Sequence, residues 1–490
     1  MKKVLFVASE VYPLIKTGGL ADVSGSLPLA LKTLGHDVRI LMPGYAPAIA
    51  AGRFEPVRKL HAQGDIAILE GKLPGSDVPV WMLAHTEYFG RTGNPYLAAD
   101  GQPWVDNPER FSLFCHVAVE IAMNRLGLHW KPDLVHCNDW QSGLVPVLLS
   151  DEPVRPASVF TIHNLAYQGV FPYETFRKLR LPSRFWSADA LEFYGQMSFI
   201  KGGLRFADRI STVSPTYAEE IQSEEFGCGL QGLLSHRRER LSGILNGIDA
   251  EFWNPAVDPL IPANFGVEDL DRRAINKTAL QKTFGLEQNP DAPLLASVGR
   301  MVQQKGIDLV IELLPQLLRL PLQIALVGTG EARYERLLAR WNRLYPERFG
   351  VRIGYNEALA HLVEAGADMF LMPSRFEPCG LNQMYSQRYG AVPIVRQIGG
   401  LADTVEDANA ANLAKGTATG LVFREATPSA LFGAIRRGLN LHEDRATWRR
   451  VQETGMKRDF SWRQSAEHYL DLYQQALADR AKSGSFYKSS

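Results

Sequence analysis

Short apolar runs alternate with longer segments of helical spacing along most of this 490-residue chain. Apolar runs that are separated by helices are typical of parallel strands in a sheet that is covered on both faces. In the first half we expect a helix over 20–34 and strands at 3–8, 37–42, 78–83, 134–136, 158–162 and 209–213. The alternation therefore predicts an α/β fold with a doubly wound sheet.

The second half repeats this scheme. We expect helices over 306–318 and 332–343 and strands at 294–298, 323–327, 351–353, 369–372 and 393–395. Residues 247–291 are rich in Pro, Asn and Asp, which favours a linker with elaborations. Ligands of open α/β sheets bind beyond the carboxyl ends of the strands. We therefore expect two α/β halves that face each other across a deep cleft near residue 245.

Composition excludes several classes of protein. The 53 basic and 53 acidic residues give a formal net charge of zero, whereas dedicated nucleic-acid binders usually carry a basic excess. The four cysteines form no C-x-x-C pair, which argues against a zinc ribbon and fits a reducing compartment. The first apolar run stops at Ser9 and Glu10, too early for a signal peptide, and no stretch approaches the ~18 apolar residues of a membrane helix. We expect a cytoplasmic protein that binds neither nucleic acid nor membrane.

A glycine loop follows the first predicted strand. It reads KTGGLADV and contains Lys16, Gly18 and Gly19 directly before a helix. Glycines let backbone N–H groups approach an anion, the helix dipole favours negative charge, and lysine adds a full positive charge. This combination favours phosphate binding over a plain strand-to-helix turn. A similar string, GGLADTV at 399–405, predicts a second glycine loop and helix N-terminus at the same cleft.

A second basic pair, Arg300 and Lys305, stands where a strand ends and a helix begins. Arginine can hold a diphosphate in bidentate fashion and lysine acts as a point charge, although ordinary surface charge is an equally good interpretation. The G-x-G at 328–330 has Arg333 where a dinucleotide fingerprint needs its third glycine, so a nicotinamide site is disfavoured. A turn that makes room for a nucleotide is still compatible with this string.

Polar residues follow several predicted strands. Glu377 at a strand end could bind a sugar hydroxyl or a developing cation, or could be a first-turn acid of the next helix. A lone histidine is more often structural, although His163 could donate a hydrogen bond to a substrate or a leaving oxygen. Asp139 could cap a helix rather than catalyse, and Asn246, at the predicted joint, could bond to a loop or to a ligand. No Asp/Glu/His cluster has metal-ligand spacing, and the G-x-S-x-G and Walker A signatures are absent from the sequence.

Five strings together resemble the bacterial glycogen synthase and plant starch synthase family. They are KTGGLADV, HNLAYQG, SVGRMVQQKG, SRFEPCGL and GGLADTV, which occur in that family's order, and the resemblance extends to about Trp462. It implies a GT-B architecture of two Rossmann-like domains. The implied parts are an acceptor and catalytic domain at 1–245, a nucleotide-sugar-binding domain at 246–459 and a helical segment at 460–490 that returns to the first domain.

The resemblance also implies a reaction and its participants. Glucose passes from ADP-glucose to the non-reducing end of an α-1,4-glucan, with retention at the anomeric carbon and without a metal or other cofactor. The implied catalytic residues are Glu377, which binds the transferred glucose, Arg300 and Lys305, which neutralise the diphosphate, and His163 and Asp139. The implied substrate-binding residues are Lys16, Gly18 and Gly19 at the phosphates, Asp22 and Asn246 at the sugar, Tyr355 at the adenine, and Cys379, Gly380, Leu381 and Asn382 at the glucose and phosphate. Asn382 stands where many members carry Thr.

Retention raises the question of a nucleophile, because a double displacement needs a carboxylate beside the anomeric carbon. Related retaining transferases have a second Glu eight positions after the first, and here that position is Tyr385. We therefore expect front-face attack, with the leaving phosphate accepting the proton of the acceptor hydroxyl. Three alternatives remain open from the sequence: a transferase that uses UDP-glucose or builds another glucan, an inert glucan-binding homologue, and, least favoured, an NAD-dependent oxidoreductase.

Overall fold

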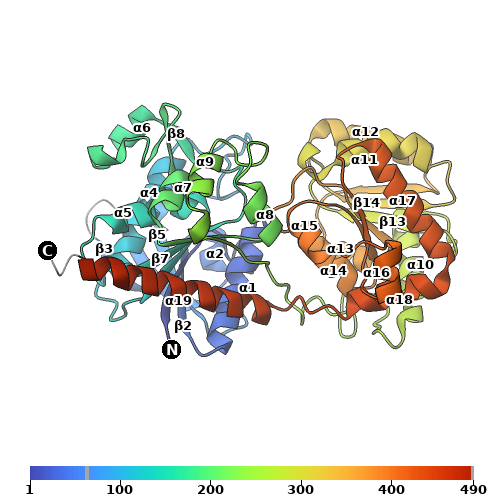
Figure 1. The fold of residues 1–490 in the computed structure, drawn as a ribbon, viewed down its shortest axis with the longest axis horizontal. Coiled ribbons are helices and arrows are strands. Elements are labelled where there is room, and N and C mark those ends of the chain that lie inside the picture. The colour runs from blue at the N-terminus through green and yellow to red at the C-terminus, as the bar shows by residue number, and fades with distance from the viewer. Residues whose placement is uncertain (61–65, 487–490) are drawn as a thin grey trace. The chain divides into compact units, whose positions relative to one another are not determined.

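The computed structural model describes residues 1–60 and 66–486. The chain divides into two compact units. One comprises Met1–Gly247 together with Trp462–Ser490, and the other comprises Ile248–Ser461. The end of the chain therefore returns to the unit in which the chain began (Figure 1).

The first unit is built on a mixed sheet with the strand order β12-β11-β7-β6-β1-β2-β5-β4-β3. Its strands are β1 (Lys3–Val7), β2 (Asp37–Pro43), β3 (Phe54–Leu60), β4 (Ile66–Lys72), β5 (Pro79–His85), β6 (Leu134–Asn138), β7 (Ala157–Ile162), β11 (Arg209–Thr212) and β12 (Leu241–Gly243). The strands from β12 to β5 are parallel, and β4 and β3 add an antiparallel edge. A separate small sheet joins β8 (Val170–Pro172), β10 (Gln196–Ser198) and β9 (Glu192–Phe193).

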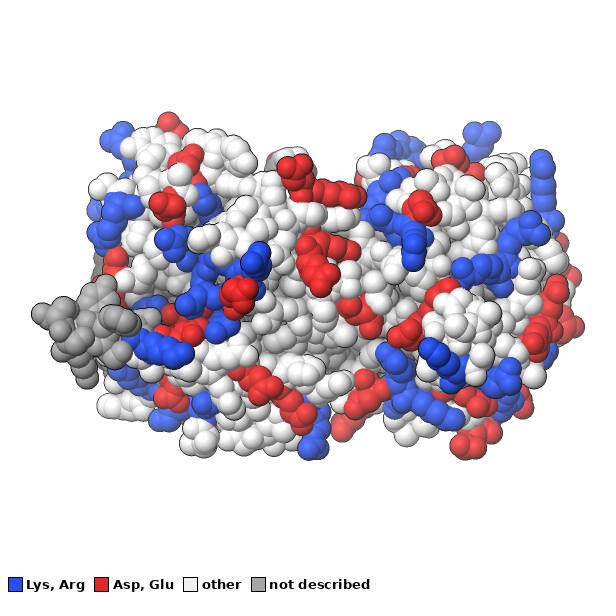
Figure 2. Space-filling model, in the orientation of Figure 1, with Lys and Arg blue, Asp and Glu red and all other residues white. Residues whose placement is uncertain are grey.

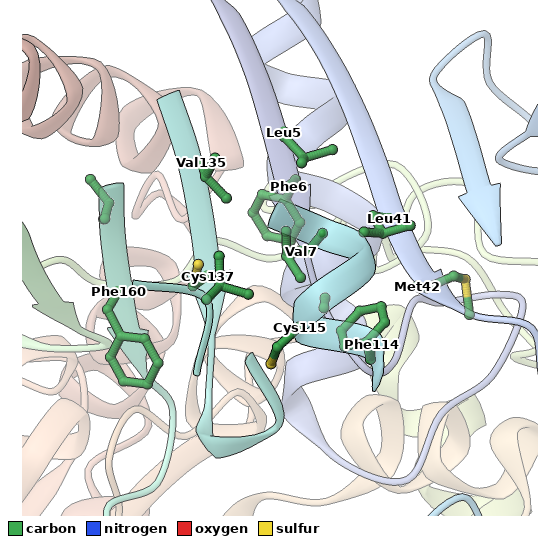
Figure 3. Close-up of a cluster of buried hydrophobic side chains, with 14 of the residues drawn as sticks. Leu5, Phe6, Val7, Leu41, Met42, Phe114, Cys115, Val135, Cys137 and Phe160 are labelled. Atoms are coloured by element: carbon green, nitrogen blue, oxygen red, sulfur yellow. The ribbon is translucent and has the colours of Figure 1, made fainter. Parts of the chain in front are cut away.

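Helices pack on the two sheets of this unit and on one another, and they bury the parallel centre of the main sheet. They are α1 (Gly19–Thr33), α2 (Ala46–Ala50), α3 (Thr86–Phe89), α4 (Asn107–Ala122), α5 (Leu144–Ser150), α6 (Tyr173–Lys178), α7 (Phe199–Phe206), α8 (Pro215–Glu220), α9 (Gln231–His236) and α19 (Trp462–Phe486). Figure 3 shows Phe114 and Cys115 of α4 beside the side chains of β1 and β2. Leu5, Phe6 and Val7 are completely buried, which explains the unbroken apolar run of the first strand.

The last helix, α19, is fixed to the first unit by a buried polar network. It packs against α1, β7 and β11 (Figure 1). Tyr473 of α19 bonds through its hydroxyl to Nδ1 of His136 at 2.7 Å, and Nε2 of that ring lies 2.6 Å from Oγ1 of Thr161. Burial lowers the pKa of His136 to about 3, so the ring is neutral and can donate from one nitrogen and accept at the other. An ion pair of 2.6 Å between Arg209 and Asp479 adds a second contact.

The second unit contains a parallel sheet with the strand order β15-β14-β13-β16-β17-β18. Its strands are β13 (Leu294–Val298), β14 (Gln323–Gly328), β15 (Phe349–Ile353), β16 (Met369–Met372), β17 (Val392–Arg396) and β18 (Leu421–Phe423). Its helices are α10 (Arg273–Phe284), α11 (Ile307–Leu317), α12 (Ala332–Leu344), α13 (Glu357–Gly366), α14 (Asn382–Arg388), α15 (Gly399–Thr404), α16 (Ala410–Lys415), α17 (Pro428–Glu443) and α18 (Arg445–Met456).

One expectation about this unit was wrong. Residues 247–291 were predicted to be a linker, but Arg273–Phe284 forms α10, which packs against α13. Its buried face includes Asn276, Lys277 and Gln281, which hid the apolar spacing that normally marks a helix. Each of these polar side chains has a partner in the unit, such as the ion pair of Lys277 with Asp368 at 2.7 Å.

Charged side chains of both signs lie on the surface, in line with the equal numbers of basic and acidic residues. Figure 2 shows basic and acidic side chains interspersed on the face that it draws. Within residues 1–60 and 66–486, no helix is both long enough and apolar enough to cross a membrane.

Candidate active site

The first glycine loop leads from β1 into α1. Gly18 is the N-cap of α1 and has an extended backbone with φ −154°. A Cβ atom added to Gly18 or Gly19 would meet nothing within 4 Å, so neither packing nor backbone conformation requires glycine there. Lys16 forms an ion pair of 2.8 Å with Asp22, in the first turn of α1. The loop thus presents a cation beside open space at the start of a helix, which suits an anion.

Asp139 directly follows β6 in a strained conformation. Its φ of 55° and ψ of 179° lie in a region that residues other than glycine rarely adopt and that costs of order 1–3 kcal/mol. Its Oδ1 accepts a hydrogen bond of 2.8 Å from the backbone N–H of His163, which follows β7. Burial raises the pKa of Asp139 to about 7. Strained backbone and a displaced pKa are both frequent at functional sites.

His163 is held by Asn138, the last residue of β6. Asn138 donates from Nδ2 to the carbonyl of Val7 at 3.1 Å, which leaves its Oδ1 to accept from Nε2 of His163 at 2.9 Å. Burial lowers the pKa of His163 to about 3, so the ring is neutral and its proton lies on Nε2. In this state Nδ1 is an acceptor, whereas the sequence led us to expect a donor. Oδ1 of Asn246, also in this unit, is buried and has no partner among the described residues.

The second unit brings Lys305 and Glu377 together. Lys305 ends a 3-10 turn at Gln303–Lys305 before α11, and Glu377 lies in the loop between β16 and α14. Nζ of Lys305 is 2.5 Å from Oε2 of Glu377, and Ser374 donates to the same oxygen at 2.9 Å. Glu377 is buried. Arg300, just beyond β13, donates to Gln304 at 3.1 Å. A cation and a buried carboxylate therefore meet at the carboxyl ends of β13 and β16.

The remaining predicted residues of this unit have varied surroundings. Cys379 is buried, and Gly380 next to it has a φ of +73°, in the left-handed region that favours glycine. Leu381 is the N-cap of α14. Asn382 donates from Nδ2 to the carbonyl of Val298 at 2.7 Å, so its amide connects α14 to the end of β13. Tyr355, after β15, is 66% exposed and its hydroxyl bonds to Glu357.

The second glycine pair has a different role from the first. The N–H of Gly400 donates to the carbonyls of Glu377 and Pro378, each at 3.2 Å. A Cβ atom on Gly400 would lie 2.2 Å from the carbonyl oxygen of Cys379. Gly400 therefore lets α15 pack against the loop that carries Glu377, and its N–H is occupied by the carbonyls of that loop. Glycine is also required by packing in the G-x-G string at 328–330, since a Cβ atom on Gly328 would lie 1.8 Å from the carbonyl oxygen of Gly299.

The two glycine pairs should respond differently to alanine. We expect Gly19→Ala to fold with an unchanged melting temperature and to lower kcat/KM for the substrate that the loop binds by about tenfold or more, because the methyl group fills the open space. Gly400→Ala should instead lower the melting temperature by several degrees, since backbone atoms would have to move. Thermal unfolding and steady-state kinetics of both variants test this. A destabilised Gly19→Ala protein with normal kinetics would contradict the assignment.

Sequence reasoning missed the residues that hold the candidates in place. Asn138 orients His163 and Ser374 bonds to Glu377. Asn138 is adjacent in sequence to Asp139, and Ser374 is three residues before Glu377, so closeness in sequence to a candidate was the available signal. In the part of the chain that the structure describes, no group of three or more His, Cys, Asp or Glu side chains is arranged to hold a metal ion.

Comparison with known proteins identifies the family. The family model for the starch synthase catalytic domain matches residues 3–236, and that for glycosyl transferases group 1 matches residues 281–453. Glycogen synthase 1 from Methylococcus capsulatus is 61% identical over 97% of both chains. Glycogen synthase from Thioalkalivibrio sulfidiphilus is 53% identical over 97% of this chain and 100% of its own.

A solved structure extends this similarity to the fold. The catalytic domain of starch synthase IV from Arabidopsis thaliana, bound to ADP and acarbose, matches with a TM-score of 0.87 and 31% identity. The match covers 97% of this chain and 99% of that one. With relatives this similar over nearly their whole length, the chain belongs to the family of bacterial glycogen synthases and plant starch synthases, which are glycosyltransferases with the GT-B fold.

Proposed function

We propose that this protein transfers glucose from ADP-glucose to the non-reducing end of an α-1,4-glucan, with retention at the anomeric carbon, and so elongates glycogen. The observation that carries the proposal is the pairing of Lys305 with buried Glu377 at 2.5 Å, in a chain that is 61% identical to a glycogen synthase. ADP and acarbose in the Arabidopsis starch synthase structure support a nucleotide donor and a glucan acceptor. In this proposal residues 1–245 bind the acceptor and carry out catalysis, and residues 246–459 bind the nucleotide sugar. Residues 460–490 return to the first domain.

The second unit supplies the charge that the leaving group needs. The bond between the anomeric carbon and the phosphate oxygen of ADP breaks, and a bond to the acceptor hydroxyl oxygen forms. Lys305 and Arg300 neutralise the charge that develops on the diphosphate, so the proposed reaction uses no metal or other cofactor. Glu377, which Ser374 and Lys305 hold, binds hydroxyls of the transferred glucose. The leaving phosphate oxygen accepts the proton of the acceptor hydroxyl, which balances the step without a carboxylate nucleophile.

Other residues of the second unit border the donor. The exposed ring of Tyr355 stacks on adenine, which buries apolar ring surface that is otherwise open to water. Cys379, Gly380 and Leu381 line the glucose and phosphate. Asn382 contributes through its backbone, because its side-chain amide already donates to Val298.

The first unit binds sugar and phosphate with groups that have room for a ligand. Lys16 exchanges its partner Asp22 for a donor phosphate, and Gly18 and Gly19 allow close approach. Nδ1 of His163 and the buried Oδ1 of Asn246 accept hydrogen bonds from sugar hydroxyls. Asp139 and Asp22 complete the sugar contacts. We place this reaction in the cytoplasm, because all four cysteines are free thiols, and neither nucleic acid nor membrane takes part in it.

Release of ADP tests the proposal. Purified protein given ADP-glucose should release ADP only when glycogen is present, and UDP-glucose should yield little UDP under the same conditions. Equal release of UDP would favour the alternative donor. Release of neither nucleotide would favour an inert glucan-binding homologue, which a direct measurement of glycogen binding would then establish.

A further inference from the structure

Glu10 lies three residues beyond β1 and is buried, and its carboxylate is surrounded by donors. Oε2 accepts from the backbone N–H of Thr17 at 2.5 Å and of Gly18 at 3.2 Å. Oε1 accepts from the hydroxyls of Thr17 and Tyr96, each at 2.6 Å. Such a carboxylate, with four donors, is a strong and geometrically specific connection between segments.

This connection closes the loop that carries Lys16. Residues 10 and 17–18 are the two ends of the loop, and Val11 pairs with Ile15 inside it. The N–H of Tyr12 donates to the carbonyl of Ala21 at 3.0 Å, which holds the loop against the first turn of α1. Lys16 lies one residue before the two N–H groups that Glu10 binds. The position of its backbone therefore depends on the Glu10 carboxylate.

Tyr96 anchors the same carboxylate from a distant segment. Its hydroxyl also lies 2.8 Å from Oγ of Ser9, and its carbonyl accepts from Asn107 at the start of α4. Burial raises the pKa of Tyr96 well above its usual value, so the hydroxyl keeps its proton and is always available to donate. Glu10 thus links the glycine loop to a rigid helix.

We propose that Glu10, supported by Tyr96, is the positioning residue for Lys16, because it holds the glycine loop through the N–H groups of Thr17 and Gly18. The inference rests on the proposed contact of Lys16 with the donor phosphates. Glu10 occupies the N–H groups of Thr17 and Gly18 from the protein interior, while the space beside Gly18 and Gly19 remains open. Its effect on the reaction is therefore indirect and passes through Lys16.

A double-mutant cycle tests this role. Glu10→Gln keeps the shape but replaces one acceptor oxygen by an amide that cannot accept from the loop. We expect it to raise KM for ADP-glucose about tenfold and to leave KM for glycogen within twofold. In a Lys16→Ala background the same change should have almost no further effect. The affinity of Glu10→Gln for ADP alone, measured by calorimetry, should fall by a factor similar to the rise in KM for ADP-glucose.

Asp208→Asn is the matched control. Asp208 is a poorly exposed carboxylate of the same unit with donors from Arg155 and Ser158 at 2.7–2.9 Å, none of them in the glycine loop. It should lower the melting temperature without changing KM for ADP-glucose. If Glu10→Gln does not fold, Tyr96→Phe removes one of the four bonds and should give a smaller shift in the same direction.

The outcomes separate this inference from the proposed function. An unchanged KM for ADP-glucose in Glu10→Gln, or an equal effect with and without Lys16, overturns the positioning role while the function stands. Normal donor kinetics and normal ADP affinity in Lys16→Ala alone would contradict the proposed role of Lys16, and the positioning role with it.

Discussion

Lys305→Ala is expected to lower kcat at least ~100-fold, the scale for losing one preorganised electrostatic contact in a transition state. The side chain is 29% exposed and its partner Glu377 keeps the hydrogen bond from Ser374, so the fold should survive. The loss should fall on kcat because negative charge on the diphosphate grows as its bond to the anomeric carbon breaks. Steady-state rates with saturating ADP-glucose and glycogen measure it directly.

Lys277→Ala is the matched control for this prediction. Lys277 forms the other lysine–carboxylate pair described for this unit, with Asp368 at 2.7 Å, and it supports α10. Leaving Asp368 without this partner should destabilise the protein by about 3–5 kcal/mol, yet the folded fraction should keep a kcat within about threefold of the parent. A near-normal kcat in Lys305→Ala would show that Arg300 alone neutralises the leaving group.

The parallel strands could be predicted from the sequence because burial on both faces makes them apolar throughout. The strand predicted at 294–298 is β13, and that at 369–372 is β16. The antiparallel edge strand β3 was missed because its residues are largely exposed and charged residues interrupt its apolar ones. Helix α10 was missed because polar residues on its buried face, which are hydrogen-bonded within the unit, interrupt the apolar spacing of a helix.

The sequence was enough to predict which residues follow the strands, but not which of these residues contact one another. Lys305 and Glu377 are 72 residues apart, and only the adjacency of β13 and β16 brings them within 2.5 Å. The two glycine pairs share the string GGLAD, but a methyl group is accommodated at Gly19 and excluded at Gly400. That difference depends on neighbouring backbone atoms, which no local string encodes. In the sequence, Glu10 only marks the end of an apolar run, and nothing near it predicts its bonds to the glycine loop.

Asp139→Asn is expected to lower activity at least ~100-fold and at the same time to stabilise the fold. The carboxylate is 9% exposed, and burial raises its pKa from 3.8 to about 7. At pH 8 the native protein therefore carries a charge in an environment that disfavours it. Asparagine preserves an oxygen that can accept from the N–H of His163. The substitution therefore removes the destabilisation that the buried charge causes, and it also removes the contribution of the carboxylate to activity.

The stabilisation should depend on pH with a definite sign. A carboxyl group whose pKa is raised in the folded state stabilises the fold in its protonated form. That contribution is complete below pH 3.8, is lost as pH rises toward 7, and is absent above it. The difference in unfolding free energy between Asp139→Asn and the parent should therefore grow between pH 4 and pH 7 and level off near 4 kcal/mol, an order-of-magnitude value.

Denaturant unfolding of both proteins at several pH values from 4.5 to 8 gives this difference. A difference that is constant across the range would show that Asp139 titrates normally, and that the buried charge is not the source of any gain in stability. A decreasing difference would mean that the native site favours the ionised carboxylate, which would contradict the raised pKa of Asp139. The expected increase, together with the loss of turnover, would show that this position is maintained for catalysis at the expense of stability.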